Sequence, residues 1–270
     1  MEARLSERCL ALQSRYDRLA RLRPMALARF VLALTAAGDR RTITPTPLGI
    51  DLYVDPLSNL GHTLTSPSCF EEERRALTNY LQPGGIFVDI GANEGALSAL
   101  AGTLVGLNGI VLAVEPQTRL QDIIRINTAL NGLTNVRPVG CALSEANGEA
   151  TLYLYPDLNT GASGLVRGYR FSRAMERVRV RTASDLLDEH LIGHADLVKV
   201  DVEGYEPEVV RGLLPALRAG RIGMLMVDYH APLLARRGIS AEPTHRLILE
   251  AGMVRRDDGP LRGYAVYGAS

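Results

Sequence analysis

The residues best suited to chemistry in this sequence stand where short apolar segments end. The first segment, 86–90, runs into a turn, and the acidic, polar and glycine residues of this region are Asp89, Gly91, Asn93, Glu94 and Gly95. A strand, such a turn and a helix form the nucleotide-binding edge of a doubly wound sheet. The pyrophosphate of a dinucleotide needs the spacing G-x-G-x-x-G, which this turn lacks. Because two carboxylates flank the turn, we expect a cationic ligand, and S-adenosylmethionine fits that demand better than NAD.

A second apolar segment, 110–115, ends in a carboxylate and is followed by Pro116. Glu115 lies 24 residues after Gly91. An acid at the end of the second strand of such a sheet can accept hydrogen bonds from both hydroxyls of a ribose. We therefore predict that Glu115 binds the ribose of the cofactor, with Pro116 beside it.

Three ionisable residues, Lys199, Asp201 and Glu203, alternate at a third strand end and so share one face of the strand. Charged groups are costly to bury in an apolar core, which favours a functional site here. We predict catalytic roles for Asp201 and Lys199, a contact of Asp201 with the cofactor, and a contact of Glu203 with the substrate. A structural Lys199–Asp201 ion pair is the alternative, because ion-pair networks resemble active sites.

A fourth strand end carries Asp228 and His230, after the apolar segment 223–227. His230 is the natural general base, since an unperturbed imidazole titrates at about pH 6.5. Asp201 is its rival for that role, and Asp228 is a candidate substrate ligand. The three residues could also bind Mg²⁺ or a similar ion, but their spacing matches no dedicated metal motif, so we expect no metal.

The acceptor would be bound by Asn159 and Ser163, in a loop whose amides and hydroxyls suit a hydroxylated ligand. The alternative is a surface loop of small turn residues. Six arginines follow between positions 167 and 181, and we interpret them as a solvated face.

Four segments occur in order between Phe70 and His230: VDIGANEGALS, AVEP, CALSEANGEATL and LVKVDVEGYEPEVVRG. Together with the pair Asn127 and Asn131 they resemble the FkbM family of S-adenosylmethionine-dependent methyltransferases. The resemblance implies the class I methyltransferase fold and O-methylation of a small molecule, such as a sugar or a polyketide-type natural product. It also implies cofactor contacts, with the methionine part held by Asp89, Gly91, Asn93 and Gly95 and the adenine by Ala142 and Leu143.

Two other functions stay open. The chain could be a catalytically silent partner subunit that binds S-adenosylmethionine, or it could methylate a carboxyl or an amine. A silent subunit would combine an intact glycine turn with unreactive strand ends, and the presence of Asp201, Glu203 and His230 argues against it.

The elements that position these residues follow from apolar runs that alternate with helical stretches. Further strands are expected at 136–140, 197–201, 224–229, 252–255 and 264–267, and helices at 95–105, 118–131, 183–190, 207–218 and 243–251. This alternation predicts an α/β protein with a doubly wound, mostly parallel sheet covered on both faces. The resemblance to the FkbM family implies that this sheet is the seven-stranded, Rossmann-like sheet of the class I methyltransferase fold.

The expected domains are an N-terminal helical extension (1–45), a turn-rich segment with a short strand or hairpin (46–81) and the methyltransferase domain (82–270). Within the last, residues 151–180 are expected as a polar, glycine-rich insertion. The N-terminal helices could cap the domain or mediate a homodimer.

The composition excludes several classes of partner. Lys plus Arg and Asp plus Glu both number 30, and there are no Trp and 4 Phe, so neither a basic field nor an aromatic platform for nucleic acid is present. The apolar stretch 25–37 is too short to span a bilayer, which predicts no stable membrane insertion. Three scattered cysteines favour a reduced, cytoplasmic protein. The expected partner is a hydroxylated small molecule.

Overall fold

A seven-stranded sheet forms the centre of the computed structural model, which describes residues 40–167, 174–257, 259–261 and 263–269. Its strands are β3 (Ile86–Ile90), β4 (Ile110–Val114), β5 (Val136–Val139), β9 (Ala195–Val200), β10 (Ile222–Tyr229), β11 (Met253–Arg255) and β12 (Gly263–Ala269). The spatial order is β11-β12-β10-β9-β3-β4-β5, and only β12 runs antiparallel to its neighbours. The predicted mostly parallel sheet is confirmed, with each strand within two residues of its expected bounds.

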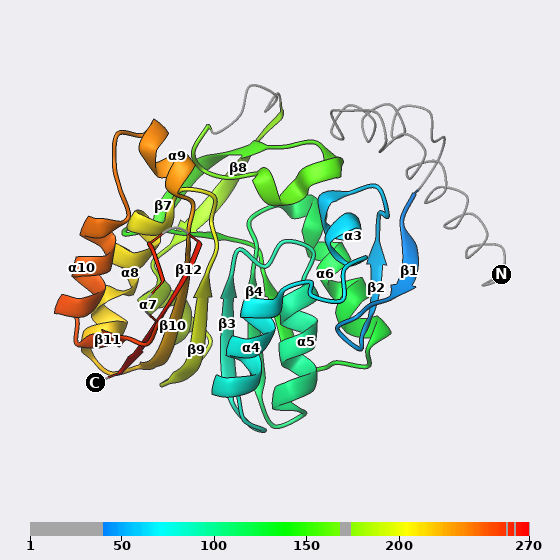
Figure 1. Cartoon of the computed structure of the whole chain (residues 1–270), viewed down its shortest axis with the longest axis horizontal. Coiled ribbons are helices and arrows are strands. Elements are labelled where there is room, and N and C mark those ends of the chain that lie inside the picture. The colour runs from blue at the N-terminus through cyan, green and yellow to red at the C-terminus, as the bar shows by residue number, and fades with distance from the viewer. Residues whose placement is uncertain (1–39, 168–173, 258, 262, 270) are drawn as a thin grey trace.

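Helices cover both faces of this sheet (Figure 1). One face packs against α4 (Glu71–Tyr80), α5 (Ala96–Val105) and α6 (Thr118–Leu130), the other against α7 (Ala183–Glu189), α8 (Glu206–Arg218) and α10 (Glu242–Glu250). Alternate residues of β3 enter the two cores, Phe87 the first and Val88 and Ile90 the second. Because both faces are buried, the strands are continuous apolar runs, which is why the sequence identified them.

Three short helices were not predicted. These are α4, α3 (Asn59–Thr63) and α9 (Ala231–Arg236). In α4 only Glu73, Ala76 and Leu77 are buried, so its apolar periodicity is too sparse to indicate a helix. The five predicted helices are confirmed to within one residue at each end.

A second, three-stranded sheet replaces part of the expected polar insertion. Its order is β6-β8-β7, formed by Ala142–Leu143, Ala174–Arg181 and Gly148–Leu154, and the 3-10 helix η1 (Asp157–Ala162) lies between β7 and β8. In β8 the buried Val178 and Val180 alternate with the exposed Arg177 and Arg179. The arginines therefore form the solvated face of a strand, and the prediction missed the strand because the arginine run concealed its alternation.

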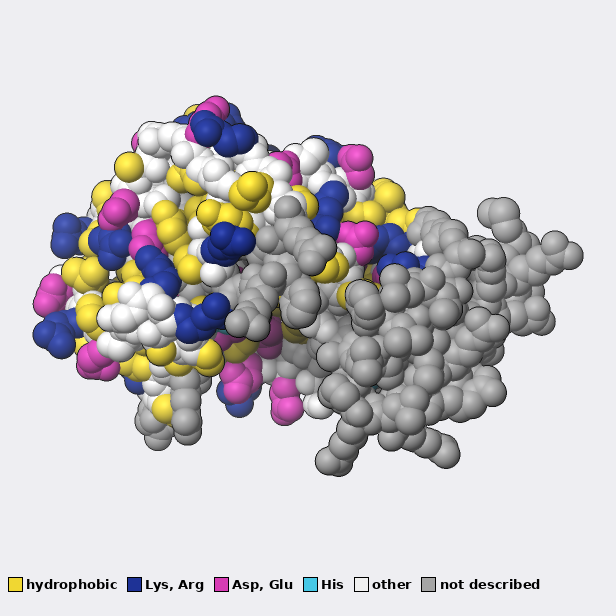
Figure 2. Space-filling model, turned by 90° about the horizontal axis from the view of Figure 1, so that it is seen from above, with side chains coloured by type: hydrophobic (Ala, Val, Ile, Leu, Met, Phe, Trp, Pro, Cys, Tyr) yellow, Lys and Arg dark blue, Asp and Glu magenta, His cyan; other side chains and the backbone are white. Residues whose placement is uncertain are grey.

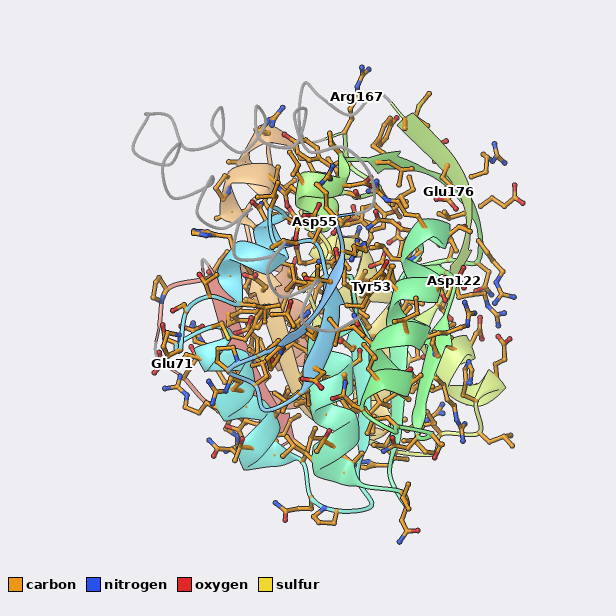
Figure 3. The ribbon with its side chains drawn as sticks, turned by 90° about the vertical axis from the view of Figure 1, so that its right-hand side faces the viewer. Tyr53, Asp55, Glu71, Asp122, Arg167 and Glu176 are labelled. Atoms are coloured by element: carbon orange, nitrogen blue, oxygen red, sulfur yellow. The ribbon has the colours of Figure 1, made fainter. Side chains whose placement is uncertain are left out.

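An antiparallel hairpin of β1 (Thr42–Pro45) and β2 (Asp51–Val54) lies beside α6 (Figure 3). The side-chain amide of Asn131, at the end of α6, pairs with both backbone groups of Asp51 in the way that a neighbouring strand does. Its Nδ2 donates to the Asp51 carbonyl (2.7 Å), and its Oδ1 accepts from the Asp51 N–H (3.0 Å). Asn127 Oδ1 accepts from the Tyr53 N–H at 2.6 Å. The hairpin thus begins inside the segment expected to be helical, and residues 1–39 of that segment, with the dimer contact predicted there, lie outside the described residues.

Within the part of the chain that the structure describes, no helix has the length and apolar character needed to cross a bilayer. The described side chains on the face seen from above carry interspersed positive and negative charges (Figure 2).

Gly91 is required where β3 and β9 come together. Its φ is +85°, and a Cβ atom at this position would lie 1.8 Å from the Asp201 carbonyl oxygen. We expect Gly91→Ala to lower the free energy of unfolding by at least about 3 kcal/mol, because backbone strain and steric overlap add. Gly220→Ala is the matched control, since Gly220 also has positive φ (+66°) but an added Cβ atom there would have nothing within 4 Å, and it should cost about 1–2 kcal/mol. Equal losses in urea denaturation of the two variants would contradict this.

Candidate active site

A cavity of about 120 Å³ lies at the carboxyl edge of the sheet, where β3 and β9 are neighbours but their following connections diverge. This is the position at which doubly wound sheets bind ligands. Nine of the predicted site residues line it: Gly91, Asn93, Glu115, Pro116, Ala142, Leu143, Ser163, Asp201 and Glu203. The structure thus brings together residues from the ends of β3, β4 and β9 and from the insertion.

Glu115 stands at the end of β4 with both carboxylate oxygens held by backbone donors. Oε2 accepts from the Asn93 N–H at 2.9 Å and Oε1 from the Gln117 N–H at 3.0 Å. Burial raises the pKa of Glu115 to about 7, although these two N–H groups oppose the shift. A carboxylate has about four acceptor positions, so Glu115 can still accept hydrogen bonds from a ligand in the cavity.

Lys199 is a buried ammonium between two strands. Its Nζ lies 3.4 Å from Asp89 Oδ1 and 3.1 Å from Asp201 Oδ2, while Ser98 Oγ donates to Asp89 Oδ2 at 2.6 Å. Burial opposes the charge of Lys199, but Asp201 and Asp89 outweigh it and raise its pKa. The predicted structural ion pair is therefore present. Asp89 and Lys199 do not line the cavity, in contrast to the predicted cofactor contact of Asp89 and catalytic role of Lys199. They lie on the side of Asp201 away from the cavity and position its carboxylate.

Glu94 and Gly95 also lie away from the cavity. The Glu94 side chain is buried and receives two bonds from the Arg41 guanidinium, at 2.7 and 3.0 Å. Arg41 precedes β1, so Glu94 attaches the hairpin to the turn after β3 and does not present a free charge to a cationic ligand. Gly95, with φ +80°, precedes α5 and allows close packing on Ile124.

The loop that contains η1 closes one side of the cavity. Thr160 Oγ1 donates to Asn93 Oδ1 at 2.8 Å, and Gln117 Nε2 donates to the Thr160 carbonyl at 3.2 Å. Ser163 lines the cavity, whereas Asn159 does not, and the predicted contact of Ser163 with the acceptor stays a prediction. The sequence analysis did not identify Thr160 and Gln117, although Thr160 belongs to the same polar loop.

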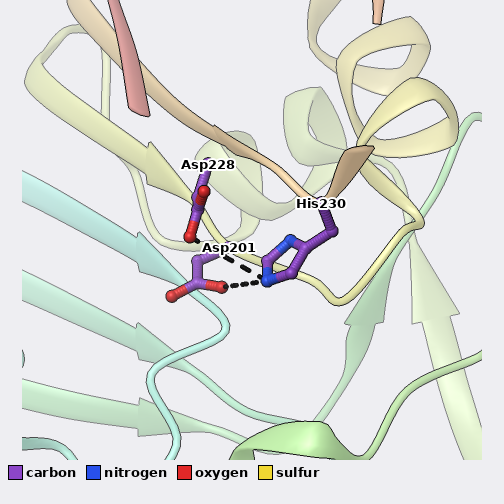
Figure 4. Close-up of side chains that lie close together, drawn as sticks. All are labelled: Asp201, Asp228 and His230. Carbon is purple, nitrogen blue, oxygen red and sulfur yellow. Dashed lines mark ion pairs between the residues drawn. The ribbon is translucent and has the colours of Figure 1, made fainter. Parts of the chain in front are cut away.

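Beside the cavity, His230 faces a group of carboxylates (Figure 4). Its Nδ1–H donates to Glu206 Oε1 at 2.8 Å, since a carboxylate can only accept. Its Nε2 lies 3.7 Å from Glu203 Oε1, 3.8 Å from Asp201 Oδ1 and 3.9 Å from Asp228 Oδ2. We call Asp201, Glu203, Glu206, Asp228 and His230 the acidic cluster. Glu206 was missed because an acid in the first turn of a helix is common without any functional role.

The acidic cluster shifts the pKa values of its own members. Burial would lower the pKa of His230, but the hydrogen bond to Glu206 and the charges of Glu203 and Asp201 raise it to about 10. His230 therefore carries a proton at neutral pH, which does not suit the predicted role of a free general base. Burial raises the pKa of Glu203 to about 7 and, together with the charge of Asp201, that of Asp228 to about 6. Burial also acts against ionisation of Asp201, but Lys199 and His230 outweigh it and lower its pKa.

The Arg41–Glu94 pair gives a stability prediction. We expect Arg41→Ala to lower the free energy of unfolding by about 3–5 kcal/mol, because the fully buried Glu94 carboxylate loses its counter-charge. The double variant Arg41→Ala/Glu94→Ala should lose less than the single one. Arg177→Ala is the control, because its pair with Glu149 is mostly exposed and should contribute under about 1 kcal/mol. Urea denaturation measures all three, and a small loss in Arg41→Ala alone would refute the anchoring role.

Comparison with known proteins places this geometry in context. The model of the methyltransferase FkbM domain matches residues 89–254. The methyltransferase sdnD of Sordaria araneosa is 33% identical over 155 residues, which are 47% of this chain and 59% of that protein. The hexuronic acid methyltransferase AglP of Haloferax volcanii is 24% identical over 177 residues, 66% of each protein. The matches therefore span somewhat less than two thirds of either relative.

Among solved structures, a putative methyltransferase from Streptococcus mutans has a TM-score of 0.48 at 13% identity and covers 86% of this chain and 56% of its own. A methyltransferase from Aquifex aeolicus has a TM-score of 0.43 at 15% identity, and the match covers 77% of this chain and 95% of that protein. The strand order and the cavity agree with the fold expected from the sequence. Since the domain match takes in more than half of the sequence, the chain belongs to the FkbM family of methyltransferase domains.

Proposed function

We propose that this methyltransferase transfers the methyl group of S-adenosylmethionine to a hydroxyl of a small molecule, such as a sugar or a polyketide-type natural product. The observation that carries the proposal is the position of Glu203, which lines the cofactor cavity and also lies 3.7 Å from His230. The cofactor site and a group of proton-accepting side chains are thus adjacent. One of the relatives is named for a hexuronic acid, which supports a sugar-like acceptor.

The transfer is an in-line displacement. The acceptor oxygen attacks the methyl carbon, the carbon–sulfur bond breaks, the sulfonium becomes a neutral thioether and the hydroxyl loses its proton to a base. Glu203 is our candidate for the base that takes this proton, because the residue lines the cavity and its Oε1 lies 3.7 Å from His230 Nε2. Asp201 lies beside it, with Oδ2 held by Lys199, so its position is fixed when the acceptor enters.

Two alternatives make different demands on the same site. A silent cofactor-binding subunit would not need carboxylates at the cavity, so Asp201 and Glu203 argue against it. An amine acceptor is the second candidate, because the carboxylates of the acidic cluster would attract a cation. Incubation with S-adenosylmethionine and a panel of glycosides, macrolactones and amines, with the methyl located by NMR, distinguishes oxygen from nitrogen products. Absence of S-adenosylhomocysteine with every acceptor, despite cofactor binding, would favour the silent subunit.

The contact of Glu115 with the ribose makes cofactor affinity depend on pH. The pKa of Glu115 is raised to about 7, so the neutral form, which accepts fewer hydrogen bonds, is populated below that pH. We expect the affinity for S-adenosylmethionine to increase as pH rises from 6 to 8. Glu115→Gln should weaken binding by about 10–100-fold and flatten this dependence, because a bond to a charged acceptor contributes about 1.5–3 kcal/mol. Calorimetric titration at several pH values measures both, and an unchanged slope in the variant would exclude Glu115 as its source.

The role of Glu203 is tested by kinetics. We expect Glu203→Gln to lower kcat by at least about 100-fold, the usual contribution of a general base, while the Kd of S-adenosylmethionine changes by less than about threefold. Glu149→Gln is the matched control on the exposed face of β7, where the carboxylate pairs only with Arg177 among the described residues. A parallel loss of cofactor binding in Glu203→Gln would indicate a binding role for this carboxylate.

A further inference from the structure

Asp201, Asp228 and His230 face one another without direct hydrogen bonds (Figure 4). His230 Nε2 lies 3.8 Å from Asp201 Oδ1 and 3.9 Å from Asp228 Oδ2, whereas an N–H···O bond measures about 2.7–3.2 Å. One potential ligand atom from each residue lies within 4.8 Å of the other two. Ligand atoms roughly 2.1 Å from a Mg²⁺-sized cation are roughly 3–4 Å apart. The two separations measured from His230 Nε2 fall within this range, and one oxygen of Asp201 lies within 4.8 Å of one oxygen of Asp228.

Each of these side chains is oriented by a partner on its other side. Lys199 holds Asp201 Oδ2 at 3.1 Å, which leaves Oδ1 on the side of His230. Glu206 holds His230 Nδ1 at 2.8 Å, which leaves Nε2 on the side of the aspartates. A carboxylate bonded to the outer nitrogen of a histidine is the usual arrangement behind a metal-binding imidazole, where it fixes the ring and its tautomer.

The charge of the acidic cluster also favours a cation. Among the described residues, none donates a hydrogen bond to the half-buried carboxylates of Asp228 and Glu203. The Glu206 side chain is completely buried: its Oε1 accepts from the Gly204 N–H and from His230 Nδ1, both at 2.8 Å, whereas its Oε2 has no hydrogen-bond partner in the described part of the chain. Carboxylates held out of water without donors are costly unless a positive charge compensates them. The positive charges beside these four carboxylates are the His230 imidazolium and the Lys199 ammonium next to Asp201, so the compensation is incomplete.

We propose that Asp201, Asp228 and His230 bind one divalent cation of the Mg²⁺ or Mn²⁺ class. Ligand sets dominated by carboxylate oxygen suit these ions, and Mn²⁺ also accepts imidazole. The cation takes the place of a proton at His230 Nε2. Its position beside Asp201 and the cavity gives it a role that rests on the proposed function: a hydroxyl bound to it is more acidic, and Glu203 lies close enough to accept the proton.

The test is a titration of the full chain with Mn²⁺ after dialysis against a chelator, followed by the electron paramagnetic resonance signal of free Mn²⁺. We expect one Mn²⁺ bound per chain. Asp228→Asn and His230→Gln should each weaken binding at least tenfold, and Glu206→Gln by about 10–100-fold. Asp122→Asn is the control and should bind as the original chain does, because Asp122 lies on the outer side of α6 with an exposed carboxylate paired to Arg125 (Figure 3).

Two results would overturn the proposal. One is the absence of stoichiometric Mn²⁺ binding to the original chain. The other is equal binding by the original chain and by Asp228→Asn and His230→Gln, with folding of the variants verified by circular dichroism. Two further measurements separate the cation proposal from the proposed function: calorimetric titration with S-adenosylmethionine, and an assay of product formation, each with and without chelator. Transfer that persists in chelator without Mn²⁺ binding rejects the cation alone, and Mn²⁺ binding without transfer to any acceptor rejects the hydroxyl methylation alone.

Discussion

The buried ammonium of Lys199 joins the two strands on which the site is built. It lies between Asp89 of β3 and Asp201 after β9. These two strands are neighbours in the middle of the sheet, where its two halves meet. A buried charge of this kind is stable only while its partners stay in place. The two ion pairs of Lys199 therefore fix the carboxyl ends of both strands. They also position the turn that contains Gly91 and the residues around Asp201. Gly91 adds a steric constraint, since no side chain fits against the Asp201 carbonyl.

The charges of the acidic cluster are linked to Lys199 through Asp201. Asp201 is compensated on one side by Lys199, so its second oxygen meets His230, which in turn is held by Glu206. The result is a histidine whose pKa is raised and two carboxylates, Glu203 and Asp228, whose pKa values are raised as well. Burial is the largest cause for the two carboxylates, whereas the hydrogen bond to Glu206 and the neighbouring carboxylates raise the pKa of His230 against the effect of burial.

The sequence predicted the parts of this arrangement that depend on local pattern. β3 and β4 were identified because both faces of each strand are apolar, and Glu115 and Asp201 because they end such strands. Glu94 was interpreted as a charge facing the ligand, but its neutralising partner Arg41 is 53 residues away in the chain, so no local pattern could reveal the pair. The role of Glu206 depends likewise on a contact with His230 from another element. β8 was missed because its exposed arginines dominate its composition, and the N-terminal extension up to residue 39 stays a prediction.

The loop around η1 has a consequence for the speed of the enzyme. Thr160 is bonded to Asn93 and to Gln117, and the residues that follow it, Gly161, Ser163 and Gly164, form one wall of the cofactor cavity. Hydrogen bonds between three separate segments hold this wall in place, and a closed wall of this kind would limit the access of water during the proposed transfer. The spent cofactor must also leave through a boundary of this cavity after every cycle. When loop opening is slower than chemistry, it determines the turnover number. In the proposed reaction, the hydrogen bonds from Thr160 to Asn93 and from Gln117 to Thr160 would then bear on the rate of product release.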